Sequence, residues 1–199
     1  MSSLNLEKYD EWKDDPDMIG DVMRFLDNVL SDFINKAPDQ FKDAKYSAER
    51  ERSVGLGVMG FHSFLQKKRI PLESVMAKSW NKKIFKNIHE KVNQASKDLA
   101  EERGACPDAA EYGFKERFSN KTAIAPTASI SIICGGASPG VEPIAANSYT
   151  HKTLSGSFNV RNRYLEEILE SHGKNDDETW STITTNQGSV SHLDFLTDL

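Results

Sequence analysis

Residues 120–143 read N-K-T-A-I-A-P-T-A-S-I-S-I-I-C-G-G-A-S-P-G-V-E-P. In this stretch an otherwise heavily charged chain almost loses its charge. Residues 122–125 form a short apolar run, and Pro126 ends it because the residue before a proline is held in extended geometry. Small hydroxyl residues then alternate with Ile, in a pattern that suits the start of a helix. The first turn of a helix offers unsatisfied N–H groups and the positive end of its dipole, so this segment predicts an anion site. Simple helix capping uses the same chemistry, and the residues alone leave both interpretations open.

Two well-known catalytic loops do not fit this segment. It contains no G-x-x-x-x-G-K-[ST], so no lysine is placed to reach a terminal phosphate, and no G-x-S-x-G that would form a nucleophile elbow. The small side chain of Ala128 leaves room for a ligand oxygen to approach the backbone. Glu142, just past the glycine-rich turn, is either a general acid/base or an ion-pair and capping residue.

Composition limits the classes of function. The 199 residues carry 28% charged side chains and a formal net charge of −5, which argues against a nucleic-acid groove. No apolar run approaches the roughly 20 residues of a membrane span, and the N-terminus is not a signal peptide. Cys106 and Cys134 lack C-x-x-C spacing, which indicates a reducing, cytoplasmic setting, and Cys106 is expected to be a packed structural thiol. The five histidines show no close-spaced ligand pairs, so we expect no metal site.

Apolar periodicity predicts mainly helices. A capped start at residues 14–17 opens a helix that Ala37 and Pro38 stop, with one broad apolar face against the core. The longest helix is expected over residues 71–103, ended by Gly104. The inward residues of these two helices are predicted to be Met18, Ile19, Val22, Phe25, Leu26, Val29, Leu30, Phe33 and Ile34 in the first, and Ile84, Phe85, Ile88, Val92, Ala95 and Leu99 in the second. Shorter helices are expected over residues 61–68, over residues 161–172 and from residue 175, whereas residues 40–52 indicate a charged surface connection.

Short strands are expected between these helices. Residues 2–6 are typical of the end of a strand with nothing before it to pair, and residues 144–158 indicate a strand and turn. The fold class is therefore a helix-rich α/β fold, and we expect residues 1–199 to form a single domain. Both ends of the sequence look cut, because an apolar segment is still in progress at Leu199.

A formal G-x-G-x-x-G occurs at Gly55, Gly57 and Gly60. A charged run precedes it where a buried strand should be, and residues 75–80 lack the acidic ribose ligand of a dinucleotide site. Glycines that let a strand approach its neighbours closely are the favoured interpretation. A small dinucleotide oxidoreductase remains a third hypothesis for the chain.

Several motifs occur together and in order. They are R-S-V-G-L-G-V-M-G-F-H-S-F-L at residues 52–65, R-G-A-C-P at 103–107, N-K-T-A-I-A-P-T-A-S-I-S at 120–131, G-V-E-P at 140–143 and L-S-G-S-F at 154–158. In this combination the chain resembles, over essentially its whole length, the large catalytic subunits of ribonucleotide reductases. The resemblance is strongest to class I enzymes of phage and bacterial type, with cobalamin-dependent class II enzymes as the nearest competitor.

The resemblance implies a fold and a site. The family's catalytic subunit is a ten-stranded α/β barrel, so residues 1–199 would be a single partial domain from its later part. The family's P-T-x-[ST] turn holds the substrate phosphates, which implies contacts from Thr127, Ser129 and the backbone around Ala128, Ile130 and Ser131, with Pro126 shaping the turn. Some class I members carry an acidic residue at the position of Ala128, so the contacts do not transfer in detail.

The resemblance also implies what other parts of the protein would supply. The N-x-C-x-E loop of the thiyl cysteine is absent, and neither cysteine fits the redox motifs, so no catalytic residue is expected here. The expected partners are the rest of the large subunit, a radical-generating small subunit and a ribonucleoside di- or triphosphate, with self-association through uncovered apolar surface. The chain itself would bind no cofactor; the whole enzyme would use a metal-generated radical in its partner subunit, or adenosylcobalamin if it is class II. A fragment of such an enzyme, inactive alone, is the first hypothesis, and a free-standing nucleotide- or phosphate-binding module without catalysis is the alternative.

Overall fold

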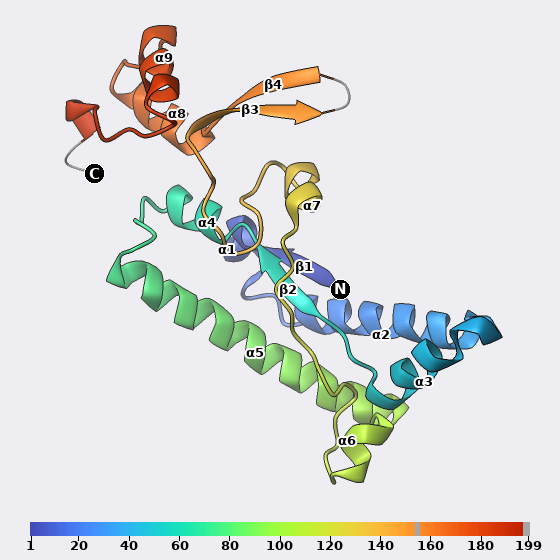
Figure 1. Cartoon of the computed structure of the whole chain (residues 1–199). Helices are drawn as coiled ribbons and strands as arrows, with labels where there is room; N and C mark the ends of the chain where they lie inside the picture. The colour runs from blue at the N-terminus through green and yellow to red at the C-terminus, as the bar shows by residue number, and fades with distance from the viewer. Residues whose placement is uncertain (154–155, 197–199) are drawn as a thin grey trace.

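A computed structural model describes residues 1–153 and 156–196 of the chain (Figure 1). Its elements, in chain order, are β1 (Ser2–Asn5), η1 (Leu6–Lys8), α1 (Tyr9–Trp12), α2 (Met18–Lys36), η2 (Asp39–Phe41), α3 (Lys42–Glu51), β2 (Leu56–Met59), α4 (Phe61–Lys67), α5 (Val75–Arg103), α6 (Pro107–Glu111), α7 (Ala128–Ile133), β3 (Ser148–Thr153), β4 (Gly156–Arg161), α8 (Arg163–Ser171), α9 (Asp177–Thr185) and η3 (Asp194–Leu196). The helix-rich α/β class is confirmed. The described residues form no closed barrel, since their sheets are a parallel pair and an antiparallel hairpin.

Three extended segments run parallel at the centre of the main body. β1 pairs with β2 in a register that sets Ser2 opposite Leu56, so the N-terminal strand does have a partner, supplied from later in the chain. The apolar run at residues 122–125 lies as extended chain along β2, joined by one parallel bridge between Leu56 and Thr122. Its hydrogen bonds run from Leu56 N to Lys121 O (3.0 Å) and from Ala123 N to Leu56 O (3.2 Å).

Gly57 permits the close approach of these segments. A Cβ at this position would lie 2.2 Å from the carbonyl oxygen of Ala123, which is backbone and cannot swing aside. At Gly60, which has φ +78°, a Cβ would meet Asn5 Oδ1 at 2.7 Å. The protein's own atoms thus occupy the space that the glycines leave, as the strand-packing interpretation predicts.

The main core lies where α2 and α5 pack against this parallel trio. The predicted stripe of α5 is largely confirmed, and the helix starts at Val75 after a cap in which Ser74 Oγ accepts from Ala77 N (3.1 Å). Cys106 is fully buried, as expected of a structural thiol. The buried residues of this core are Leu4, Leu6, Tyr9, Trp12, Ile19, Met23, Leu26, Leu56, Val58, Phe61, Phe64, Leu65, Ala77, Ile84, Ile88, Val92, Ala95, Leu99 and Phe118.

Two expectations about the first third of the chain were wrong. Phe25, Val29 and Phe33 on α2 are exposed, because the apolar arc of this helix is wider than the surface that α5 covers. Residues 40–52 are not a surface connection but mostly helix α3, which packs on α2 and α6. The charges of this segment are used in ion pairs: Arg50 binds Asp108 and Glu111 of α6.

A second, smaller hydrophobic cluster lies in the C-terminal part. Leu165 and Leu169 of α8 pack against Trp180 and Ile183 of α9. The β3–β4 hairpin lies beside these helices at one end of the molecule, while α3 and α6 lie toward the other (Figure 1). Leu154 and Ser155 of the predicted strand and turn lie outside the described residues.

Within residues 1–153 and 156–196, no helix is long and apolar enough to cross a membrane. The same residues contain no group of three His, Cys, Asp or Glu side chains placed to hold a metal ion.

Candidate anion site at the carboxyl ends of the parallel segments

The candidate site lies where the three parallel segments end. β1 ends at Asn5, β2 at Met59, and the third segment reaches Pro126 just before α7 begins (Figure 1). Parallel α/β folds place their ligand sites at the carboxyl ends of the strands, where the chain turns into the next element. The stretch singled out in the sequence therefore occupies the edge at which a ligand site is expected.

Thr127 makes the turn from the extended segment into α7. Its φ of 53° and ψ of 27° are left-handed, a conformation that is costly for a β-branched residue. Thr127 is 7% exposed, and its Oγ1 accepts a hydrogen bond from Gly140 N (2.8 Å). This bond closes the loop between residues 127 and 140 and helps to hold the unusual backbone in place.

The first turn of α7 presents backbone donors outward. Ala128, Ser129 and Ile130 are exposed, and their amide N–H groups have no acceptor among the residues that the structure describes. The Ser129 hydroxyl likewise has no hydrogen-bond partner within that part of the chain. Three neighbouring N–H groups and a hydroxyl at the positive end of a helix form the arrangement that binds phosphate or carboxylate oxygens.

Ser131 closes this turn from the inner side. Its amide donates to Thr127 O (2.9 Å) and its buried hydroxyl donates to Ala128 O (3.2 Å). The Ser131 amide is therefore already used inside the helix. The six predicted site residues do lie on one turn, but they divide into outward donors (128–130) and residues that shape the turn (126, 127 and 131).

The glycine-rich loop after α7 is anchored to α4 by a reciprocal serine pair. Ser138 N donates to Ser63 Oγ (2.8 Å), and Ser63 N donates to Ser138 Oγ (3.1 Å). Gly60 N also donates to Ser138 O (2.7 Å), directly after the end of β2. Nothing in the sequence predicts this anchor, because two ordinary serines 75 positions apart carry no local signal of pairing.

His62 holds the chain beyond the loop. Its Nδ1 accepts from Ile144 N (3.1 Å), and burial lowers the pKa of His62 below its ordinary value of 6.5. The neutral ring needed for this bond is thus favoured. Glu142 is exposed and has no ion pair within residues 1–153 and 156–196.

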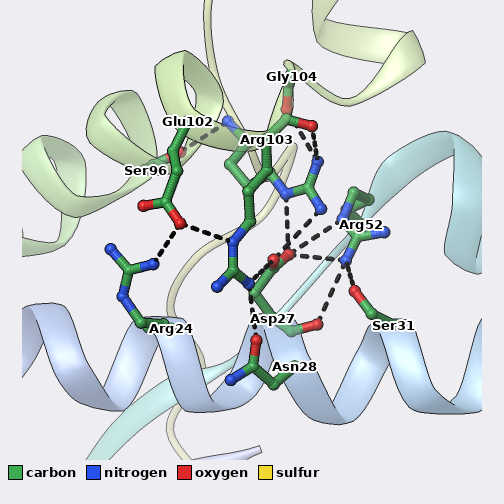
Figure 2. Close-up of polar contacts among 10 residues, drawn as sticks. Arg24, Asp27, Asn28, Ser31, Arg52, Ser96, Glu102, Arg103 and Gly104 are labelled. Atoms are coloured by element: carbon green, nitrogen blue, oxygen red, sulfur yellow. Dashed lines mark hydrogen bonds and ion pairs between the residues drawn. The ribbon is translucent and has the colours of Figure 1, made fainter.

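A buried ion cluster centred on Asp27 of α2 also went unrecognised in the sequence (Figure 2). Asp27 of α2 is fully buried and accepts five hydrogen bonds from three guanidinium groups, those of Arg52, Arg103 and Arg117. Burial alone would raise the Asp27 pKa, but these hydrogen bonds outweigh it and hold the pKa below its ordinary value. An aspartate on the inward side of a predicted apolar helix was the only signal in the sequence.

The cluster joins four parts of the main body. Arg52 follows α3, Arg103 ends α5, and Arg117 also donates to the backbone oxygens of Arg103 (3.1 Å) and Gly104 (2.9 Å). At its exposed edge, Arg24 and Arg103 hydrogen-bond Glu102 and hold the pKa of that carboxyl at about 2 (Figure 2). The charged side chains of the cluster form hydrogen bonds and ion pairs with one another, which indicates a structural role for the cluster.

Comparisons with known proteins agree with the motifs. The family described as "Ribonucleotide reductase, barrel domain" matches residues 1–117 and 108–198. A ribonucleoside-diphosphate reductase large subunit of invertebrate iridescent virus 6 is 50% identical over 195 residues, which cover 97% of this chain and 20% of that protein. A vitamin B12-dependent ribonucleoside-diphosphate reductase of Thermoplasma acidophilum is 38% identical over 167 residues, covering 78% of this chain and 21% of that protein.

Among solved structures, the chain is similar to the class Id ribonucleotide reductase alpha subunit of Actinobacillus ureae. The TM-score is 0.88 at 39% identity, and the match covers 98% of this chain and 36% of that one. The chain thus spans between a fifth and about a third of the length of these relatives.

Proposed function

The chain belongs to the ribonucleotide reductase barrel-domain family, and we propose that its residues 126–131 hold the phosphates of a ribonucleotide substrate. The protein in which this segment acts would be a ribonucleotide reductase large subunit. That enzyme would reduce ribonucleoside di- or triphosphates at the 2′ carbon to deoxyribonucleotides by radical chemistry.

The observation that carries the proposal is the outward first turn of α7. The amides of Ala128, Ser129 and Ile130 lack acceptors among the described residues, and phosphate oxygens would supply them. The Ser129 hydroxyl would add a fourth donor. Pro126, Thr127 and Ser131 would contribute by fixing the turn rather than by touching the ligand with their side chains.

In this role the segment would act by electrostatic positioning. Anchoring the phosphates holds the ribose in one orientation, which lowers the entropic part of the barrier to reaction at its 2′ carbon. The radical cysteine and the redox cysteines would come from other parts of the large subunit. The isolated 199-residue chain is therefore expected to show no reductase activity.

The proposal includes two alternative sources of the radical. The relatives include both a vitamin B12-dependent enzyme and a class Id alpha subunit, so a radical-generating partner subunit and adenosylcobalamin are both retained. A cytoplasmic location is proposed on the reducing setting that the cysteine pattern indicates.

An amide NMR titration of the chain tests the phosphate site. Pyrophosphate and a nucleoside diphosphate should shift the amide signals of Ala128, Ser129 and Ile130, and the matching nucleoside without phosphate should not. A Ser129→Asp variant should abolish these shifts, because its carboxylate would occupy the same donors. The Ser129→Asp variant should keep the stability of α7, because an acidic side chain in the first turn interacts favourably with the helix dipole. A Ser181→Asp variant on α9 controls for the added charge, and unchanged phosphate binding by Ser129→Asp would contradict the proposal.

The affinity found in that titration separates the two functional hypotheses. Tight binding by the chain alone would favour a free-standing phosphate-binding module. Weak binding that is nevertheless confined to residues 128–130 would favour a site completed by the rest of a large subunit.

A further inference from the structure

Arg163, the first residue of α8, connects the C-terminal part of the chain to the far end of α7. Its Nη1 donates to Gly135 O (2.7 Å), and its Nη2 lies 2.6 Å from Glu7 Oε1. The same Nη2 donates to Tyr164 Oη (3.1 Å). One guanidinium therefore joins the segment after β1, the loop after α7 and the start of α8.

The guanidinium has contacts on several sides, although the Arg163 side chain is 41% exposed. Its Cζ lies 5.1 Å from the ring centroid of the buried Tyr164, and burial raises the pKa of that tyrosine, so its phenol stays neutral. The Glu7 side chain is only 12% exposed, which strengthens its attraction for Arg163. Asn162 fixes the start of α8 by accepting from Tyr164 N (3.1 Å) and donating to Asn147 Oδ1 (2.7 Å).

Gly135 lies two residues beyond Ile133, the last residue of α7, and so follows the end of this helix opposite the outward amides. Carbonyl groups at the C-terminal end of a helix carry the negative end of its dipole, where a cation and a hydrogen-bond donor are stabilising. A helix of six residues is marginal without such support, because its few internal hydrogen bonds do not offset the cost of ordering it. Another side-chain donor at this end is weak, with Asn5 Nδ2 at 3.5 Å from Cys134 O.

We infer that Arg163 is a positioning residue for the phosphate turn: by holding the C-terminal end of α7, it keeps the amides of residues 128–130 directed at the ligand. The inference rests on the proposed function. Arg163 acts on the end of α7 opposite the phosphate, and Glu7 both orients and neutralises its charge. The phosphate turn is thereby linked to the packing of α8 and α9.

Substitutions at Arg163 in the full 199-residue chain test the inference. Arg163→Met keeps the length of the side chain and removes its donors and charge, whereas Arg163→Lys keeps the charge and one donor group. Arg161→Met is the matched control in the same part of the chain, because the ion pair and the ring contact of Arg161 are with α9: it pairs with the exposed Asp177, and its Cζ lies 5.0 Å from the Trp180 ring centroid. Three properties are measured for each variant: the affinity for pyrophosphate, the hydrogen exchange of the α7 amides without ligand, and the midpoint of thermal unfolding.

We expect Arg163→Met to bind pyrophosphate about tenfold more weakly, the loss that follows from one hydrogen bond to a charged group. The α7 amides should exchange faster, while the α5 amides should not. Arg163→Lys should fall between this variant and the wild type, and Arg161→Met should match the wild type in pyrophosphate affinity and in the exchange of the α7 amides. If Arg163→Met fails to fold, Arg163→Lys decides: weaker binding with an unchanged unfolding midpoint supports the inference.

The failures of the two proposals are distinguishable. A wild-type chain whose α7 amides do not respond to pyrophosphate overturns the proposed function, and the role of Arg163 falls with it. A wild-type chain that binds, with Arg163→Met binding equally well or showing unchanged exchange in α7, overturns the inference and leaves the phosphate site standing.

Discussion

Replacing Asp27 with Asn should destabilise the main body strongly. The carboxylate accepts from Arg52 Nη2 (2.7 Å), Arg103 Nη1 (2.9 Å) and Arg117 Nε (2.9 Å), and it is fully buried (Figure 2). An amide keeps one acceptor oxygen and directs two N–H donors at guanidinium groups that are themselves donors only. Arg52 and Arg117, whose side chains are each 10% exposed, would be left with uncompensated charge.

The magnitude follows from this burial. Breaking a buried ion pair from one side costs about 3–5 kcal/mol, because the remaining charges stay desolvated. For a chain of this length, such a loss lowers the unfolding midpoint by roughly 10 °C. Asp32→Asn is the matched control on the same helix, since Asp32 forms an exposed i,i+4 pair with Lys36. It should cost about 0.3–0.5 kcal/mol.

Urea and thermal unfolding followed by far-UV circular dichroism would measure both variants against the wild type. The dependence of the free energy of unfolding on pH in the acid range gives a second measurement. Because the folded-state pKa of Asp27 is lowered, its contribution is present above the unfolded-state pKa and is lost as the pH falls through the folded value. Asp27→Asn should remove this part of the acid sensitivity. A loss below about 1 kcal/mol, comparable to an exposed pair, would refute the structural role of the cluster.

The remaining predictions concern packing, pH and association. Gly57→Ala should cost about 3 kcal/mol in the free energy of unfolding, because its Cβ would meet a backbone oxygen at 2.2 Å. Gly20→Ala, whose Cβ would meet nothing within 4 Å in α2, should instead be stabilising by about 0.5–1 kcal/mol; equal effects would contradict the close approach at Gly57. Since burial lowers the pKa of His62, its neutral form stabilises the fold above about pH 6.5 and this contribution is lost as the pH falls. The His62→Gln variant should therefore show a flatter pH profile of unfolding, and an identical profile would count against the buried neutral ring. The exposed apolar face of α2 predicts concentration-dependent self-association in sedimentation, which Phe33→Glu should reduce; a monomer at every concentration would contradict it.

Local patterns in the sequence identified the elements that local physics decides. The α5 stripe, the glycines of β2 and the extended-to-helix turn at Pro126 follow from periodicity, close approach and proline geometry. The outward first turn of α7 follows for the same reason, because a helix start leaves its first amides without internal partners.

Contacts between segments that are distant in the sequence could not be predicted from local patterns. Helix α3 lacks apolar periodicity, and its charges find partners in α6. The three arginines of the ion cluster lie 25, 76 and 90 positions from Asp27, and nothing local marks their convergence. The exposed face of α2 was misassigned because periodicity shows which residues are apolar but not how much of the face a neighbour covers.

The most direct test of the phosphate site is diffraction from crystals of the chain soaked with a nucleoside diphosphate. The account predicts phosphate oxygens about 3 Å from the backbone nitrogens of Ala128, Ser129 and Ile130, with Thr127 still bonded to Gly140. Phosphate groups bound elsewhere, or an empty turn in crystals where the α7 amides face open solvent channels, would contradict it.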